Sequence, residues 1–147
     1  MNNQEISRKY NCLLKEYDDI YCHVAKHFHM SESEFWILYI LFTEQTQPTQ
    51  RELCLRLHAP KQTIHSALRK MEQAEWIHYI ALKDHRMKQI ALCEKGYQAA
   101  LSTVALITAK EESAFQCFSD EEKSNFISLL ERYVIHLKDT MKAYSVD

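Results

Sequence analysis

Apolar residues recur at three- and four-residue steps along the first part of the chain, which is the period of an amphipathic helix. Residues 5–28 carry one such stripe and predict a long helix. Ser31-x-x-Glu34 follows as a capping box, in which each side chain accepts from the other residue's backbone amide. The helix that it opens, to about Gln45, is apolar nearly all round, so we expect it to be buried centrally.

Two short helices are predicted next, separated by a brief break. Thr49-x-x-Glu52 is a second capping box and predicts a helix to about Leu57. After the break at residues 58–59, Pro60 suits the first turn of another helix, where its missing N–H costs nothing. We expect that helix to span Pro60–Ala74.

The period then changes from that of a helix to that of a strand. Residues 77–82 and 88–92 predict two strands, and the polar residues 83–87 predict the turn between them. Helical periodicity resumes from Glu94 to about Phe118, which we interpret as one helix. Ser119-x-x-Glu122 then opens a last helix with an apolar stripe.

This order predicts a mostly α (α+β) fold, namely a winged helix-turn-helix with long N- and C-terminal helices that form a dimerisation layer. Two short helices with a tight turn, followed by a hairpin, make up the winged module. We expect one intertwined domain, with residues 49–96 as the DNA-binding region and residues 1–48 and 97–147 as the helical dimerisation region. The exposed stripes of the terminal helices predict a homodimer.

Composition excludes several classes of protein. The chain of 147 residues has a single glycine, so a Rossmann site or a P-loop is nearly excluded. No known catalytic motif is present, and we expect neither an enzyme nor a cofactor or metal requirement. The longest apolar run, residues 35–42, is too short to span a membrane. Five widely spaced cysteines and the lack of a signal-peptide core predict a cytoplasmic protein.

Charge is distributed unevenly along the chain. Residues 49–96 hold nine Lys/Arg and five Asp/Glu, a net +4, which leaves −6 for the rest of a chain whose formal net charge is −2. A basic centre between acidic ends favours a surface that faces nucleic acid.

The second short helix has the composition of a DNA-reading helix, because one face is apolar and the other polar and basic. Gln62 suits a bidentate contact with adenine, and Lys61 and Arg69 suit guanine or phosphate. The predicted DNA-binding residues, including two in the hairpin, are Lys61, Gln62, Thr63, His65, Ser66, Arg69, Arg86 and Lys88.

Residues 49–96 contain, in order, Met71-Glu72, Trp76-Ile77, Asp84-His85-Arg86 and Leu92-Cys93-Glu94-Lys95-Gly96. On these motifs the chain resembles the MarR family of bacterial transcriptional regulators. The family pattern is a helix-turn-helix, Leu-Glu, Gly-Leu-Ile/Val, a wing of the form Asp-x-Arg-Asp-x-Arg, and Leu-Thr-x-x-Gly. The resemblance implies an intertwined homodimer on double-stranded DNA, a wing arginine in the minor groove and a small-molecule effector. Two reading helices related by a two-fold axis should bind a pseudo-palindromic operator, and we expect the protein to act as a repressor.

The chain departs from the family pattern at four positions. Glu75 replaces a glycine, so we expect a less sharp turn after the reading helix. Met87 replaces the second wing aspartate and leaves Asp84 to orient Arg86. Cys93 replaces the threonine that caps the next helix, and a thiol is a poor cap. Gln89 stands near the position of the second wing arginine.

Alternative interpretations rest on other residues. Tyr17, Tyr21 and Trp36 are candidates to line an effector pocket. His23 and His27 lie on one helical face and suggest a metal sensor, and Cys12 and Cys22 suggest an oxidant sensor. Cys54 and Cys117 are expected at core-facing positions. A winged-helix module that binds protein rather than DNA is the remaining alternative.

Overall fold

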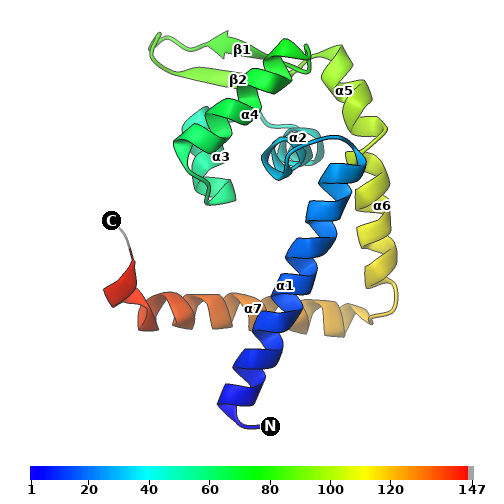
Figure 1. Ribbon diagram of the computed structural model, residues 1–147, viewed down its shortest axis with the longest axis vertical. Coiled ribbons are helices and arrows are strands. Elements are labelled where there is room, and N and C mark those ends of the chain that lie inside the picture. The colour runs from blue at the N-terminus through cyan, green and yellow to red at the C-terminus, as the bar shows by residue number, and fades with distance from the viewer. Residues whose placement is uncertain (146–147) are drawn as a thin grey trace. The chain divides into compact units, whose positions relative to one another are not determined.

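The computed structural model describes residues 1–145, which form helices and one small antiparallel sheet (Figure 1). The elements are α1 (Asn3–His27), α2 (Glu32–Glu44), α3 (Gln50–Leu57), α4 (Lys61–Gln73), β1 (Ile77–Ala81), β2 (Lys88–Leu92), α5 (Glu94–Leu101), α6 (Val104–Phe115), α7 (Asp120–Thr140) and a short 3₁₀ turn (Lys142–Tyr144). The chain divides into two compact units, Met1–Leu106 and a second that begins at Ile107. The first unit contains the predicted helix-turn-helix and hairpin.

The three predicted capping boxes are all present. The hydroxyl of each N-cap residue accepts from the amide three residues later, and the glutamate there accepts from the N-cap amide. These N-caps are Ser31, Thr49 and Ser119. A fourth box, at Asn2, begins α1. Such caps satisfy amides that have no partner within the helix, which explains why these helix starts are predicted so closely from local sequence.

The predicted single helix from Glu94 to Phe118 is wrong, because α5 ends at Leu101 and α6 begins at Val104. The two hydroxyl residues between them bond back to one carbonyl. Ser102 Oγ donates to Ala99 O at 3.1 Å, and Thr103 Oγ1 donates to the same oxygen at 2.7 Å. Side-chain bonds of this kind compete with the helical ladder and bend or end a helix.

Helix α2 lies in the core of the first unit, as its all-round apolar pattern predicts. Phe35, Ile37 and Leu38 are fully buried on it. The helix packs against α1, α4, α5 and β2. Fully buried residues from the surrounding elements complete the core, among them Leu53, Ile64, Leu68, Met71 and Ile90. The winged module is therefore built around a helix whose apolar residues lie largely in the interior.

The hairpin is attached to the start of α3. Strands β1 and β2 pair from Ile77 opposite Leu92 to Ala81 opposite Lys88. On the other edge of β2, Ile90 N–H donates to Pro48 O at 2.8 Å, and Thr49 forms a bridge with Gln89. The same threonine therefore caps α3 and contacts the hairpin, which ties the wing to the helix-turn-helix. The sequence pattern did not reveal this short bridge.

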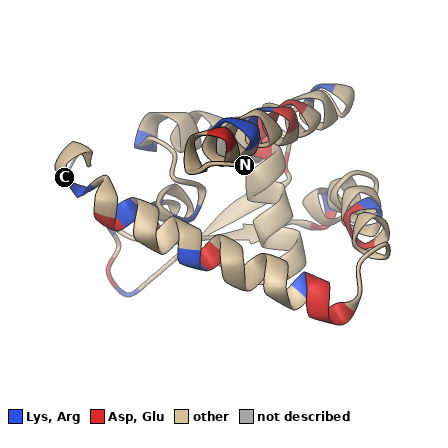
Figure 2. Cartoon of the chain, turned by 90° about the horizontal axis from the view of Figure 1, so that it is seen from below, with Lys and Arg blue, Asp and Glu red and all other residues tan. Residues whose placement is uncertain are grey.

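The second unit has an apolar helix surface without a covering layer in the described chain. Helix α7 buries none of its residues, although apolar side chains recur along it. Leu129 on this stripe is 59% exposed. Figure 2 shows acidic residues concentrated at the start of α7, with mostly uncharged residues further along. In the first unit, α1 likewise exposes Ile6, Leu13, Tyr17 and Ile20 along its length.

Across residues 1–145, none of the helices is both long enough and apolar enough to cross a membrane.

Candidate nucleic-acid interface

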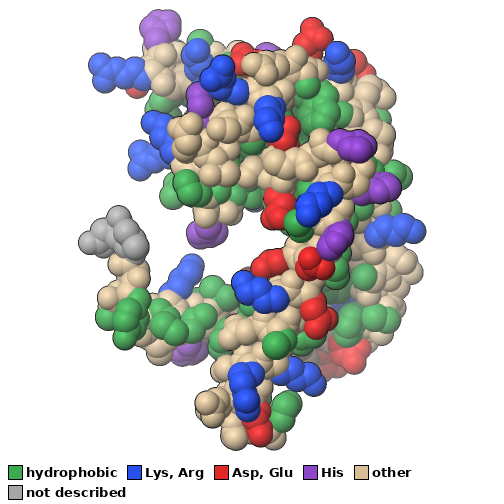
Figure 3. All heavy atoms as spheres, in the orientation of Figure 1, with side chains coloured by type: hydrophobic (Ala, Val, Ile, Leu, Met, Phe, Trp, Pro, Cys, Tyr) green, Lys and Arg blue, Asp and Glu red, His purple; other side chains and the backbone are tan. Residues whose placement is uncertain are grey.

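Helix α4 has one buried and one exposed face, as its pattern predicts. Ile64, Ala67, Leu68 and Met71 are buried. The predicted contact residues on the other face are all exposed, namely Lys61, Gln62, Thr63, His65, Ser66 and Arg69. Figure 3 shows Lys and Arg side chains gathered over the hairpin and the α3–α4 region. The structure thus presents a continuous polar and basic helix face to solvent.

The turn between α3 and α4 is tight. His58 ends α3 in the left-handed conformation, with a φ of 48°, and Ala59 N–H donates to Cys54 O at 3.2 Å. Pro60 is the N-cap of α4 and not its first helical residue, and no side chain caps this helix. Gln50 Nε2 donates to Lys61 O at 3.5 Å and joins the first turns of the two helices. Because Pro60 offers no side-chain acceptor, no N-cap hydrogen bond satisfies the free amides in the first turn of α4.

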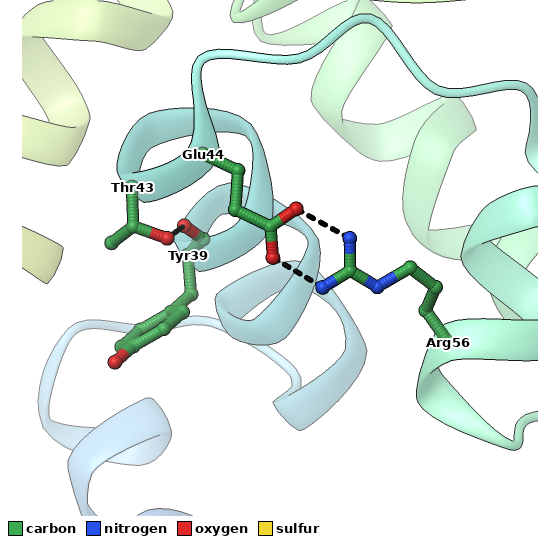
Figure 4. A network of polar contacts seen from close by, with 4 residues as sticks. All are labelled: Tyr39, Thr43, Glu44 and Arg56. Atoms are coloured by element: carbon green, nitrogen blue, oxygen red, sulfur yellow. Dashed lines mark hydrogen bonds and ion pairs between the residues drawn. The ribbon is translucent and has the colours of Figure 1, made fainter.

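An ion pair fixes the other end of α3 to α2. Both terminal nitrogens of the Arg56 guanidinium donate to the two carboxylate oxygens of Glu44 (Figure 4). The hydrogen bonds from Arg56 are the main cause of the lowered pKa of Glu44; burial opposes them, and the positive charge of Arg56 lowers the pKa further. Arg56 is therefore engaged within the protein, although it belongs to the basic central segment. Thr43 Oγ1 donates to Tyr39 O at 2.7 Å in the preceding turn of α2.

The turn after α4 keeps the conformation that glycine would favour. Glu75 has a φ of 61°, in the left-handed region. Trp76 N–H donates to Met71 O, and Glu75 N–H donates to Glu72 O, both at 2.9 Å, which is the bond pattern of a Schellman motif. The expectation of a less sharp turn is therefore wrong: glutamate adopts the strained backbone angle, and the turn is retained.

Gly96 fits a very close approach between α5 and the turn before β1. A Cβ atom at this position would lie 2.0 Å from Trp76 O and 2.7 Å from Trp76 C. The same carbonyl accepts from Cys93 N–H at 2.8 Å. Cys93 is the N-cap of α5 but its side chain makes no capping bond, as expected for a thiol, and its Sγ lies 3.4 Å from His78 Nδ1. The glycine of the Leu-Thr-x-x-Gly pattern thus has a packing role here.

Asp84 organises the tip of the wing through the backbone. Its Oδ1 accepts from Arg86 N–H at 3.1 Å, and its carbonyl accepts from Met87 N–H at 3.0 Å. The aspartate therefore orients the backbone of Arg86 and not its guanidinium. Arg86 and Lys88 are both exposed. Lys88 Nζ lies 5.8 Å from the centroid of the Tyr79 ring.

The candidate effector residues form a run of aromatic contacts. The ring centroids of Tyr17 and Tyr21 are 4.9 Å apart, and those of Tyr21 and Trp36 are 4.7 Å apart. Tyr17 is half exposed at one end of this run. The structure brings the three residues together, and their role toward an effector stays a prediction.

The candidate sensor residues are dispersed. His23 Nδ1 lies 2.7 Å from Asp19 O on its own helix, and residues 1–145 contain no group of three or more potential metal ligands. Cys12 is exposed, and Cys22 and Cys54 are partly buried. Cys117 is exposed, so its expected core-facing position is wrong.

Two contacts of the interface were missed by sequence reasoning. The Glu44–Arg56 pair joins residues twelve positions apart on different helices, and no periodic pattern signals such a pair. The Tyr79–Lys88 contact had a signal, because a hairpin with known register makes the two residues diagonal neighbours.

The chain has a helix-turn-helix, a β-hairpin after it and long helices on either side. This arrangement is that of a winged helix-turn-helix protein. Three solved structures match this fold over 90–99% of the chain. A MarR family regulator from Neisseria meningitidis is 19% identical, with a TM-score of 0.80 over 99% of this chain and 100% of that one. The S. aureus MepR–DNA complex is 19% identical, with a TM-score of 0.72 over 90% and 97%. A putative MarR family transcriptional regulator from Listeria monocytogenes, complexed with a 26mer DNA, is 19% identical, with a TM-score of 0.74 over 95% and 92%.

The chain therefore has the fold of the MarR family regulators, and the expected fold is confirmed. No family model matches the sequence, and no curated protein matches it significantly.

Proposed function

We propose that this protein is a DNA-binding transcriptional regulator that acts as a homodimer and is not an enzyme. The observation that carries the proposal is the exposed polar and basic face of α4, in a helix-turn-helix that precedes a basic hairpin. A second helix of this kind enters the major groove and presents side chains to base edges. Two proteins of the same fold were solved in complexes with DNA, which supports this function.

The proposed contacts divide between specificity and affinity. Gln62 and His65 on α4 face base edges, and Lys61, Thr63, Ser66 and Arg69 contact bases or phosphates. Lys88 contacts a phosphate, and Arg86 enters the minor groove from the wing tip. An arginine placed there binds best where the groove is narrow, so loss of Arg86 should weaken binding most on A·T-rich flanks.

The homodimer is supported by the uncovered apolar stripes of α1 and α7. Exposed apolar surface of this extent usually marks an interface. We propose that residues 1–48 and 97–147 form the dimerisation region around the DNA-binding residues 49–96. A charge on the stripe should then dissociate the dimer, so Leu129→Glu is compared with Ser128→Glu on the neighbouring residue, which is polar already. Sedimentation should give a dimer for wild type and Ser128→Glu and a monomer for Leu129→Glu. A wild-type monomer of 17.5 kDa at micromolar concentration would contradict the proposal.

Selection of DNA from a random-sequence pool tests the function itself. Two reading helices related by a two-fold axis should enrich a pseudo-palindrome with half-sites about 10 bp apart, centre to centre. The pool should be selected at a stated salt concentration, because phosphate contacts make affinity salt-dependent. An enriched site with a single half-site would contradict a symmetric dimer, and failure to enrich any site would favour the protein-binding winged module.

We further propose that the protein acts as a repressor. A small-molecule effector that binds near Tyr17, Tyr21 and Trp36 would control its binding to DNA. Tyr17, half exposed at the end of this run of rings, is the surface that supports a site for a small aromatic molecule. Release of the selected DNA by such a molecule, with loss of the effect in a Tyr17→Ala variant, is the expected result. A regulator of this kind acts where the DNA is, in the cytoplasm.

A further inference from the structure

Lys88 and Tyr79 lie on the same face of the hairpin. Tyr79 pairs with Ile90, and Lys88 precedes Ile90 by two residues, so that the tyrosine and the lysine are diagonal cross-strand neighbours. The Lys88 ammonium lies 5.8 Å from the centroid of the Tyr79 ring. This distance is within the range in which a cation is attracted to an aromatic ring face.

The ring is held more firmly than the lysine. Tyr79 is partly buried and lies inside the β1–β2 ladder, opposite the fully buried Ile90. Burial, and next the negative charge of Glu72, raise the pKa of Tyr79, so the phenol stays neutral at physiological pH. Lys88 by contrast is exposed. The tyrosine can therefore act as a fixed support for a flexible side chain.

The lysine is otherwise free to meet a phosphate. Within residues 1–145, Lys88 takes part in none of the ion pairs. It occupies the last paired position of the ladder before the wing tip, opposite Ala81. A lysine side chain loses considerable rotamer freedom when it is fixed in a complex, and prior restriction lowers that cost.

We propose that Tyr79 is a positioning residue for DNA binding, whose ring holds the Lys88 ammonium at the base of the wing where it meets a DNA phosphate. This inference rests on the proposed function and names a residue outside the predicted contact set. Tyr79 acts through Lys88 and makes no contact of its own with DNA.

A double-mutant cycle tests the proposal on the selected DNA site at several salt concentrations. The variants are Tyr79→Phe, Tyr79→Val, Lys88→Gln and the double variant Tyr79→Val/Lys88→Gln. Valine keeps the preference for a strand but removes the ring, whereas phenylalanine keeps the ring and removes the hydroxyl.

Tyr79→Val should weaken binding by about two- to tenfold per half-site, which is the cost of immobilising a lysine side chain that is no longer restricted beforehand. Tyr79→Phe should bind like wild type. Lys88→Gln should weaken binding and reduce the salt slope by about 0.9 for each DNA phosphate that the lysine no longer neutralises. In the Lys88→Gln background, Tyr79→Val should have no further effect.

Three results would overturn the proposal. An equal loss of affinity from Tyr79→Val with and without Lys88 would mean that the tyrosine acts through the fold or by itself. A loss of affinity from Tyr79→Phe equal to that from Tyr79→Val would assign the role to the hydroxyl. An unchanged salt slope in Lys88→Gln would mean that Lys88 meets no phosphate. Absence of DNA binding by wild type would instead contradict the proposed function.

NMR of the wild-type protein tests the contact directly. The ring current of Tyr79 should shift the Lys88 side-chain methylene protons upfield, and a Tyr79→Phe variant, which keeps the ring, should preserve this shift. Random-coil shifts for these protons in wild type would overturn the proposal.

Discussion

Replacing Gly96 with alanine should destabilise the protein severely for a single methyl group. The added Cβ would lie 2.0 Å from Trp76 O, where ordinary contact begins near 3.4 Å, so α5 and the preceding turn must separate by more than 1 Å. The nearest neighbours of this Cβ are all backbone atoms, which cannot rotate away. Separation would also stretch the 2.8 Å bond from Cys93 N–H to Trp76 O.

The magnitude follows from three effects. Overpacking costs typically about 1–3 kcal/mol, and the weakened hydrogen bond adds about 1 kcal/mol. Alanine gains up to about 1 kcal/mol over glycine in helix propensity. We therefore expect Gly96→Ala to lower the free energy of unfolding by about 1–3 kcal/mol.

Denaturant unfolding followed by circular dichroism measures this change. All variants are compared at one protein concentration, because the stability of the proposed dimer would depend on concentration. Gln98→Ala, at an exposed position of the same helix, is the control and should change stability by less than about 0.5 kcal/mol. A Gly96→Ala variant as stable as wild type, or more stable, would refute the close approach, since without a clash the helix propensity of alanine would favour the variant.

Three further predictions concern the same unit. Glu75→Gly should raise the free energy of unfolding by about 1 kcal/mol, because glycine adopts a positive φ without strain; Glu75→Ala, which removes the same exposed ion pair with Lys95 but keeps the strain, should not. Cys93→Ser should raise it by about 1 kcal/mol in thermal unfolding, because a hydroxyl can cap α5 where the thiol does not; no gain would mean that the cap geometry is closed to the side chain. The lowered pKa of Glu44 means that its pair with Arg56 stabilises the fold above the unfolded pKa near 4.5 and that this contribution disappears as the pH falls through the folded pKa. Glu44→Gln should therefore be less stable than wild type at pH 7, by less than about 1 kcal/mol for this partly exposed pair, and the gap should close in acid; a gap that persists at low pH would contradict this.

The sequence predicted the helix starts and the hairpin well because these depend on local chemistry. A hydroxyl and a glutamate three residues apart produced the caps of α2, α3 and α7. The strand Lys88–Leu92 was predicted to the residue. Local patterns failed where several interactions compete: Ser102 and Thr103 end α5 within a stretch whose apolar period continues.

The candidate site was predictable in its exposed residues and not in what supports them. Periodicity alone separates Gln62 and His65 from the buried Ile64 on α4. By contrast, the engagement of Arg56 with Glu44 depends on how α2 and α3 pack, which single-helix patterns do not contain. At Glu75 the surrounding turn overrides the local preference of the residue. The turn imposes a positive φ, which glutamate by itself disfavours.

The central claim is that α4 reads DNA sequence, and a binding titration of Gln62→Ala tests it most directly. Wild type, Gln62→Ala and Gln73→Ala are titrated with the selected site and with scrambled DNA at matched salt. Gln73 is the control, because it is an exposed glutamine at the far end of the same helix, about 16 Å away along the axis. Gln62→Ala should reduce the preference for the selected site by about 1–3 kcal/mol for a bidentate contact, and Gln73→Ala should leave it unchanged. An equal loss of affinity on both DNAs, or no loss, in Gln62→Ala would contradict the assignment of α4 as the reading helix.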